Sequence, residues 1–318
     1  MKFKSNFKII APATISNLAC GLDALGLALE TPQDEIIVKP IDKPGIHIVS
    51  ILNNKTKLPL DTNKNAAGIS AQLLLDFLKK EHNLEKDSGL SLSINKKVAV
   101  GHGLGSSSAS AVGGAFAVNE AFGSPLTKRE LLPFAAQAEQ IVEKQFRINS
   151  ILPSLLGGII LTRDHASYDF HRLPLIRGLH IVAIAPTNII MNRQQNSTKL
   201  PSQINLKSAI QQSANLAALI QAFYTSDLEL LSRSLTDHLA EAHWKDAIPY
   251  FEELKNAALK NKALGCSLAG SGSGVFALCK NSLEAEQVAE AMKDIYTSNK
   301  IRHSIIVSKI NHTGVQIA

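Results

Sequence analysis

A glycine- and serine-rich segment limits what this chain can fold into more than any other feature. Residues 101–110 read GHGLGSSSAS and lie between an apolar stretch typical of a strand, residues 90–100, and a stretch with helical spacing, residues 107–122. Alternating glycines let the backbone approach a ligand closely, and the free N–H groups at the start of a helix attract phosphate oxygens. The segment therefore predicts a polyphosphate-binding loop between a strand and a helix.

This loop differs from the two best-known phosphate-binding loops. It lacks the Gly-Lys-Ser/Thr ending of the P-loop, and its alternating glycines do not follow the dinucleotide-binding fingerprint. Without a lysine in the loop, neutralisation of the phosphate charge requires Mg²⁺ and the helix end. A hydroxyl, Ser107 or Ser108, and a carboxylate are the expected metal ligands. Glu139 on the next predicted helix is our candidate carboxylate, and the neighbouring Glu143 could also serve.

The rest of the sequence predicts two lobes of mixed secondary structure. With 318 residues, of which 45% are hydrophobic and 19% charged, the chain fits one large globular domain or two of ordinary size, and we expect two lobes. Strands are predicted at 34–39, 46–52, 90–100, 159–162, 181–185, 275–279 and 305–309, and helices at 65–80, 107–122, 128–145, 206–224, 227–242, 249–262 and 282–296. Because these elements follow no regular βαβ repeat, the predicted class is α+β.

Several classes of protein are excluded by composition. The formal charge of +6 comes from scattered lysines, so no nucleic-acid partner is expected. Cys20, Cys266 and Cys279 are odd in number and show no CxxC spacing, which argues against a disulfide framework or a zinc site. The first apolar stretch is broken by Pro12 and Asp23 before it could form a signal or membrane helix. We expect a cytoplasmic protein with reduced thiols and no membrane partner.

Three segments of the sequence resemble the three motifs of the GHMP kinase family. Residues 101–110 resemble the central phosphate-binding motif, with Val100 where proline is usual. Residues 11–23, APATISNLACGLD, resemble the first motif as homoserine kinases have it, and residues 268–274, LAGSGSG, resemble the third. The resemblance implies ATP-dependent phosphoryl transfer to the hydroxyl of a small amino acid or related alcohol, L-homoserine in the closest branch, with Mg²⁺ and a homodimeric protein.

The resemblance also implies a fold and a set of site residues. Residues 1–163 would form a nucleotide-binding lobe like domain 2 of ribosomal protein S5, residues 164–318 would form a ferredoxin-like lobe, and the acceptor would lie between them. Asn17 and Asp23 match positions that face the acceptor, and Ser107 and Glu139 match the metal ligands. The expected nucleotide contacts are Asn65, Lys97, Gly101, Gly103, Leu104, Gly105, Ser106, Ser107, Ser108, Ala109, Ser110, Gly270 and Gly272.

The sequence departs from the family mainly on the acceptor side. Asn149 and Ser150 stand where homoserine kinases usually have Asp and Asn. Ser197 and Trp244 stand where two arginines usually hold the amino-acid carboxylate, and neither replaces an arginine-carboxylate pair. The nucleotide motifs are kept while the acceptor pocket is changed, which predicts weakened binding of homoserine.

These departures leave three interpretations open. In the first, the protein is a homoserine kinase in which another cation, Arg193, Arg233 or Lys245, holds the carboxylate. In the second, it phosphorylates a different small alcohol, and in the third, it binds nucleotide with little transfer activity. Two cations are new relative to the family, Arg147 and Arg193. With Asn17, Asp23 and Asn149, Arg193 completes the residues that we expect at the reacting groups.

Overall fold

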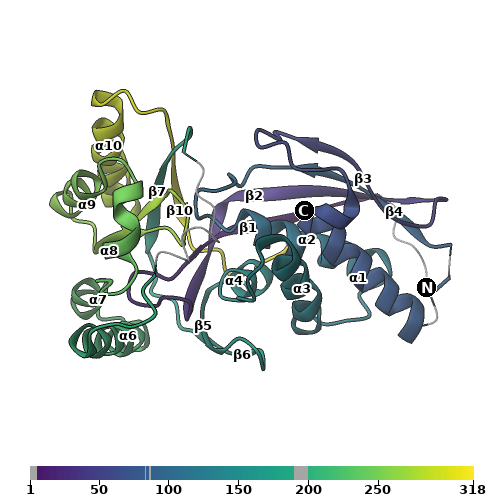
Figure 1. Ribbon diagram of the computed structural model, residues 1–318, viewed down its shortest axis with the longest axis horizontal. Helices are drawn as coiled ribbons and strands as arrows, with labels where there is room; N and C mark the ends of the chain where they lie inside the picture. The colour runs from purple at the N-terminus through teal and green to yellow at the C-terminus, as the bar shows by residue number, and fades with distance from the viewer. Residues whose placement is uncertain (1–5, 83, 86, 190–199) are drawn as a thin grey trace.

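The protein consists of two lobes, each built on an antiparallel or nearly antiparallel sheet (Figure 1). The computed structural model describes residues 6–82, 84–85, 87–189 and 200–318. In Figure 1 the helices α1 to α4 lie along one side of the first sheet, and α6 to α10 gather at the opposite end of the molecule. The predicted two-lobed α+β architecture is confirmed.

The first lobe contains a seven-stranded sheet in the order β11-β1-β2-β4-β3, with the β5–β6 hairpin attached to β2. Only the β3–β4 pair is parallel among its described strand pairs. Its strands are β1 (Phe7–Ser16), β2 (Leu25–Ile41), β3 (Gly45–Leu52), β4 (Gly89–Asn95), β5 (Ile159–Asp164), β6 (Asp169–Leu173) and β11 (Gln316–Ile317). Its helices are η1 (Thr62–Lys64), α1 (Ala66–Glu81), α2 (Ser106–Ala121), η2 (Lys128–Leu131), α3 (Leu132–Glu143) and α4 (Ile151–Leu156).

The second lobe is built on a four-stranded antiparallel sheet in the order β10-β7-β9-β8. Its strands are β7 (His180–Pro186), β8 (Gly265–Leu268), β9 (Val275–Cys279) and β10 (His303–Lys309). Its helices are α6 (Leu206–Thr225), α7 (Leu228–Ser234), α8 (Glu241–Trp244), η3 (Lys245–Ala247), α9 (Phe251–Lys260) and α10 (Ser282–Ser298). A βαββαβ order with the first strand next to the last is the ferredoxin-like arrangement that the resemblance implied.

The two lobes share one hydrophobic core through the second sheet. Successive side chains of a strand point to opposite faces, and β7 follows this rule. Ile181 and Ala183 belong to the cluster that includes β1 and β2, whereas Val182 and Ile184 belong to the cluster under α9 and α10. The second sheet therefore lies between its own helices and the first lobe, which fixes the two lobes against each other.

The ends of the first sheet do not follow the expected boundary between residues 163 and 164. This boundary falls inside the β5–β6 hairpin, in which Asp164 pairs with Asp169. The C-terminal strand also returns to the first lobe, where Ile317 pairs with Ile9 of β1. The second lobe is therefore enclosed in the sequence by parts of the first sheet, an arrangement that local hydrophobic patterns do not reveal.

The predicted helix over 227–242 is wrong, because the structure divides it into α7 and α8. Between them, the Asp237 carboxylate accepts hydrogen bonds from the backbone N–H groups of Leu239, Ala240 and Glu241 at 2.8 to 3.0 Å. An aspartate that binds the backbone just ahead of it favours a turn over a continuous helix. Trp244 of α8 is buried in the core of the second lobe.

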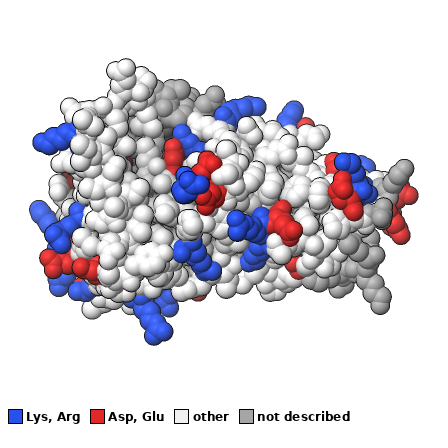
Figure 2. Space-filling model, turned by 90° about the horizontal axis from the view of Figure 1, so that it is seen from below, with Lys and Arg blue, Asp and Glu red and all other residues white. Residues whose placement is uncertain are grey.

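Surface charge, helix hydrophobicity and the state of the cysteines bear on the nucleic-acid-binding, membrane and disulfide-containing classes that the composition argued against. On the face shown in Figure 2, Lys and Arg are interspersed with Asp and Glu. Within the described ranges, no helix has an apolar stretch of the length needed to cross a bilayer. Cys20, Cys266 and Cys279 are free and buried, and burial raises the pKa of the Cys20 thiol to about 12.

Candidate active site

The three motif segments, residues 11–23, 101–110 and 268–274, meet at one place, although they lie far apart in the sequence. The N–H of Thr14 in the first segment donates to the carbonyl of Leu104 at 3.0 Å, and the N–H of Ser273 in the third donates to Gly101 at 3.1 Å. Their meeting point borders a pocket of about 230 Å³. The expected nucleotide contacts that line this pocket are Asn65, Gly101, Gly103, Leu104, Gly105, Ser106, Ser107, Ser110 and Gly272.

The phosphate-binding loop depends on left-handed glycines. Gly103 and Gly105 have φ values of 77° and 65°, and residues other than glycine rarely adopt this backbone conformation. Gly105 precedes α2, so the N-terminus of this helix opens into the pocket. The first N–H groups of a helix have no partner within it and carry its positive dipole end. This end of the pocket therefore suits the phosphates of a nucleotide.

The missing side chain of Gly103 serves a different purpose from the expected one. A Cβ at this position would lie 1.7 Å from the carbonyl oxygen of Ala269 and 3.2 Å from the Gly272 nitrogen. The glycine therefore makes room for the third segment, not directly for a ligand. In turn, a Cβ on Gly272 would lie 2.0 Å from the Gly103 nitrogen, so the two glycines require each other.

The helix α2 holds the phosphate-binding end deep in the first lobe. A Cβ on Gly114 would lie 2.1 Å from the carbonyl oxygen of Ala67, so this glycine lets α2 pack closely on α1. Asn65 begins α1 by accepting the Ala67 N–H at 3.0 Å, and its side chain also borders the pocket. One tight helix pair thus brings Asn65 and the start of α2 to the same cavity.

Lys96 lines the pocket, as Lys64 does, whereas the expected contact Lys97 does not. Lys96 is buried, pairs with Asp34, and donates to the carbonyl of Ser106 at 3.0 Å and to the hydroxyl of Ser110 at 2.9 Å. Lys97 points to Glu35 at 2.9 Å, is about half exposed and does not line the pocket. A local pattern does not distinguish two adjacent lysines, and it is the buried pairing with Asp34 that brings Lys96 rather than Lys97 to α2.

Three further expected contacts do not line the pocket. Ser108 is bonded to Glu139 and Ser150, Ala109 is buried in the hydrophobic core, and Gly270 packs against Ser16 and Gly103. These residues shape the loop and the helix without facing the cavity. Successive residues of a helix point in different directions around its axis, so a sequence motif alone does not show which of them face the pocket.

The candidate metal ligands lie together at the start of α2. Glu139 of α3 is fully buried and accepts hydrogen bonds from the hydroxyls of Ser107 at 3.0 Å and Ser108 at 3.2 Å. Glu143, one helical turn further, borders the pocket and is partly exposed. The described part of the chain has no cluster of three His, Cys, Asp or Glu residues that could hold a metal by themselves. Any divalent cation here would need phosphate or water oxygens as additional ligands.

The expected acceptor residues gather around the first segment. Asn17 has a left-handed backbone, accepts the Asp23 N–H at 3.1 Å and donates to the Gly270 carbonyl at 3.3 Å. Asn149 is buried and donates to the Asn17 side chain at 3.4 Å and to the Leu25 carbonyl at 3.3 Å. Asn17, Asp23 and Asn149 therefore form one connected group.

A chain of polar contacts joins this group to the metal ligands. Next to Asn149, the Ser150 hydroxyl lies 2.8 Å from the Ser108 hydroxyl, and Ser108 in turn donates to Glu139. The Asn17 side chain is bonded to Gly270 in the third glycine-rich segment. The expected acceptor residues thus lie beside the start of α2, and phosphoryl transfer requires donor and acceptor sites that are neighbours in this way.

The new cation Arg147 is part of the acceptor group. Its guanidinium donates to the Asp23 carboxylate at 2.7 Å, and both side chains are about one quarter to one third exposed, at 24% and 33%. Arg193 and Ser197 lie outside the described residues. Lys245 pairs with Glu252 at 2.6 Å, and Arg233 is exposed on α7. Trp244 is buried in the second lobe and carries no charge that could replace an arginine.

His165 links the backbone at Ile148 to the backbone at Asp23, and no pattern near residue 165 predicts this contact. Its Nδ1 accepts the Ile148 N–H at 3.1 Å, and the ring also bonds to the backbone of Asp23. Burial lowers the pKa of His165 below its ordinary value of 6.5, although the nearby Asp23 carboxylate opposes this shift. An Nδ1 that accepts a hydrogen bond belongs to a neutral ring, so the link needs the neutral form.

Acid is expected to remove the contribution of His165 to stability. Because its pKa is lower in the folded protein than in the unfolded chain, the contribution is complete above about pH 6.5 and is lost as the pH falls through the folded-state pKa. Above that pH, His165→Ala should lower the unfolding free energy by about 1 kcal/mol. Denaturant titrations at several pH values would check this, with the exposed His243→Ala as control. If the loss of unfolding free energy in His165→Ala did not shrink in acid, the assignment of a neutral His165 ring to this link would be wrong.

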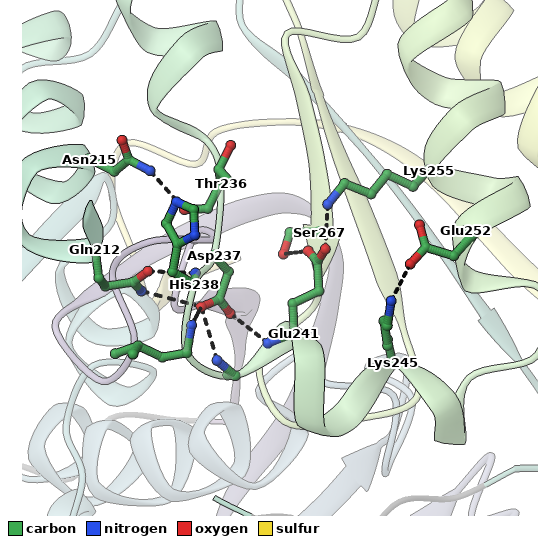
Figure 3. A network of polar contacts seen from close by, with 12 residues as sticks. Gln212, Asn215, Thr236, Asp237, His238, Glu241, Lys245, Glu252, Lys255 and Ser267 are labelled. Atoms are coloured by element: carbon green, nitrogen blue, oxygen red, sulfur yellow. Dashed lines mark hydrogen bonds and ion pairs between the residues drawn. The ribbon is translucent and has the colours of Figure 1, made fainter. Parts of the chain in front are cut away.

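A second missed residue, Gln212 of α6, connects the acceptor segment to the second lobe (Figure 3). Its amide donates to the carbonyl of Cys20 at 2.9 Å and to Asp237 at 3.3 Å, and its oxygen accepts the His238 N–H at 2.7 Å. The carboxylate of Glu241 pairs with Lys255 in the same region. The turn at Asp237 that interrupts the predicted helix therefore helps to hold the segment that carries Asn17 and Asp23.

Comparisons with known proteins agree with this arrangement. Residues 70–158 match the family model for the GHMP kinases N terminal domain, and residues 219–298 match the model for the GHMP kinases C terminal. The chain is 33% identical to a homoserine kinase of Chlorobium phaeobacteroides, with 96% of this chain and 98% of that protein covered. It is 36% identical to a homoserine kinase of Chloroherpeton thalassium, with 90% and 91% covered.

A solved structure gives the same result for the fold. The crystal structure of homoserine kinase from Cytophaga hutchinsonii matches with a TM-score of 0.93 and 34% sequence identity, and the match covers 100% of this chain and 99% of that one. Similarity at this level extends over both lobes. The protein is a small-molecule kinase, and its chain belongs to the GHMP kinase family and, within it, to the homoserine kinases.

Proposed function

We propose that this protein transfers the γ-phosphoryl group of ATP to the hydroxyl of L-homoserine, a step in threonine biosynthesis. The observation that carries the proposal is the polar connection from the start of α2 to Asp23. Glu139, Ser108 and Ser150 lead from the phosphate-binding end to Asn149, whose side chain contacts Asn17. A donor phosphate and an acceptor hydroxyl bound at the two ends of this connection would be neighbours. The names of the related proteins support the same reaction.

The residues at the phosphate-binding end fit Mg·ATP. The left-handed glycines and the N-terminus of α2 provide backbone N–H groups for phosphate oxygens. Ser107 and Glu139 offer hydroxyl and carboxylate oxygens, the ligand types that Mg²⁺ prefers, and Mg²⁺ commonly takes its remaining ligands from phosphates and water. When bound, the metal would neutralise charge on the transferring phosphoryl group.

The acceptor residues would act by positioning. The Asn17 and Asn149 side chains are buried and fixed by hydrogen bonds, so they can orient an acceptor without reorganising. Asn149 cannot accept a proton as the usual aspartate could. Phosphoryl transfer with a loose transition state depends mainly on alignment and charge neutralisation, so a strong base is not required.

The substrate assignment can be tested directly. With ATP and Mg²⁺, L-homoserine is expected to release ADP and to give a phosphate monoester detectable by phosphorus NMR. Serine has one methylene less than homoserine, and a difference of this size changes kcat/KM by about 10- to 200-fold. We therefore expect kcat/KM for homoserine to exceed that for serine by a factor in this range. A higher kcat/KM for another alcohol would assign a different acceptor, and ADP release with none would leave a nucleotide-binding homologue.

A further inference from the structure

The ion pair between Arg147 and Asp23 occupies the acceptor group, and its charges match those of an amino acid. Arg147 is a cation on the segment before α4, and Asp23 is an anion at the end of the first motif segment, residues 11–23. A free amino acid carries one carboxylate and one ammonium group. We propose, resting on the function above, that the pair opens on binding, so that Arg147 takes the substrate carboxylate and Asp23 takes the ammonium.

The surroundings of the pair favour this role over a structural one. Both side chains are partly exposed, so a solute can reach them. The groups described near them include the amides of Asn17 and Asn149, the ring of His165, whose pKa is lowered by burial, and the Asp164 carboxylate, which acts on that ring. Each charge therefore has the other as its nearest ionic partner on this side of the site. A zwitterion replaces both partners at once and leaves neither charge uncompensated.

The same proposal accounts for the missing arginines. Trp244 is buried in a hydrophobic cluster, and Lys245 is paired with Glu252, so neither offers a free cation to the site. The Arg147 guanidinium already lies within 2.7 Å of the carboxylate of Asp23. A guanidinium can bind a carboxylate through two parallel hydrogen bonds, which a lysine or a neutral amide cannot reproduce. Arg147 would thus supply, from the first lobe, the carboxylate-binding guanidinium that related enzymes supply from other positions.

The pair also makes a prediction about selectivity. An alcohol with an ammonium but no carboxylate must break the ion pair and gives Arg147 nothing in return. An alcohol with a carboxylate but no ammonium must also break the ion pair, and it gives Asp23 no cation in return. Homoserine should therefore bind much better than 3-amino-1-propanol or 4-hydroxybutanoate, each of which lacks one of the two charged groups.

The decisive experiment compares these ligands in the full-length protein and in Arg147→Gln. Dissociation constants are measured by calorimetry with a non-hydrolysable ATP analogue present, alongside KM and kcat. For homoserine, Arg147→Gln should raise the dissociation constant and KM by about 10²-fold. For 3-amino-1-propanol the same variant should bind equally well or better, because Asp23 has lost its internal competitor. Arg147→Lys should restore only part of the homoserine affinity.

The outcomes separate the possible roles of Arg147. If Arg147→Gln lost affinity equally for homoserine and 3-amino-1-propanol, Arg147 would only support the fold. If Arg147→Gln bound homoserine more tightly than the unmodified protein, Arg147 would only block Asp23. Either result would overturn the proposal. Thermal unfolding of each variant identifies any general loss of structure. If the unmodified protein binds homoserine with the expected selectivity but does not phosphorylate it, the proposed function fails while the binding role of Arg147 stands.

Discussion

Glu139→Gln is expected to lower kcat by about 10²- to 10³-fold, with a much smaller change in ATP affinity. The substitution keeps the size of the side chain and can still accept the hydroxyls of Ser107 and Ser108. It removes the negative charge that would hold Mg²⁺ beside the transferring phosphoryl group. A metal ligand acts mainly on the transition state, so the effect belongs in kcat and in the Mg²⁺ concentration that gives half-maximal rate.

Glu143→Gln is the matched control for this prediction. Glu143 lies on the same helix and borders the pocket, but no hydroxyl of α2 is bonded to it in the described contacts. It should change the rate by less than about 3-fold, as exposed charges usually do. If Glu143→Gln were the damaging variant and Glu139→Gln were mild, the metal-binding role would move to Glu143 and our assignment would be wrong.

Gly103→Ala is expected to reduce ATP affinity by at least about 10²-fold, because the added Cβ separates the loop from the third segment. The methyl group would lie 1.7 Å from the carbonyl oxygen of Ala269, a backbone atom that cannot rotate away. The loop would have to shift relative to α2, and the N–H groups at its N-terminus would no longer converge on the phosphates. Calorimetric titration with ATP would measure the loss.

Gly123→Ala separates this clash from backbone strain. Gly123 has a φ of 84°, similar to the 77° of Gly103, but an added Cβ would have nothing within 4 Å. Both variants therefore adopt a disfavoured backbone conformation, at a cost of about 1 to 2 kcal/mol each. Only Gly103→Ala adds the collision. Normal ATP affinity in Gly103→Ala, with a stability loss equal to that of Gly123→Ala, would show that the contact between the two loops is not needed for binding.

The acceptor side changes the expectation drawn from the missing arginines. The sequence predicted weak homoserine binding, since Ser197 and Trp244 cannot replace arginines. In the structure, Arg147 lies on Asp23, so a guanidinium is available within the acceptor group. With Arg147 in the proposed role, the loss of the usual arginines is offset, and homoserine remains a suitable substrate.

The sequence by itself determined the family, the two lobes and the location of the phosphate-binding loop. The reason is that these depend on local signals: the glycines at 101, 103 and 105, the helix that follows them, and the order of three short motifs. A left-handed glycine before a helix has the same consequence in any surrounding fold. The resemblance implied that Ser107 and Glu139 are metal ligands, and in the structure the two side chains lie 3.0 Å apart.

Only the tertiary structure decided which side chains face the site. It selected Lys96 over Lys97 through a buried aspartate, Asp34, and it brought His165 and Gln212 to the acceptor segment. It also placed Arg147 on Asp23, which lies 124 positions away in the sequence. Contacts of this kind depend on how sheets and helices pack, and a side chain that completes a distant hydrogen bond leaves no periodic pattern near its own position. The substrate-binding end of the site is built from such contacts, whereas the phosphate-binding end is built from local backbone conformation.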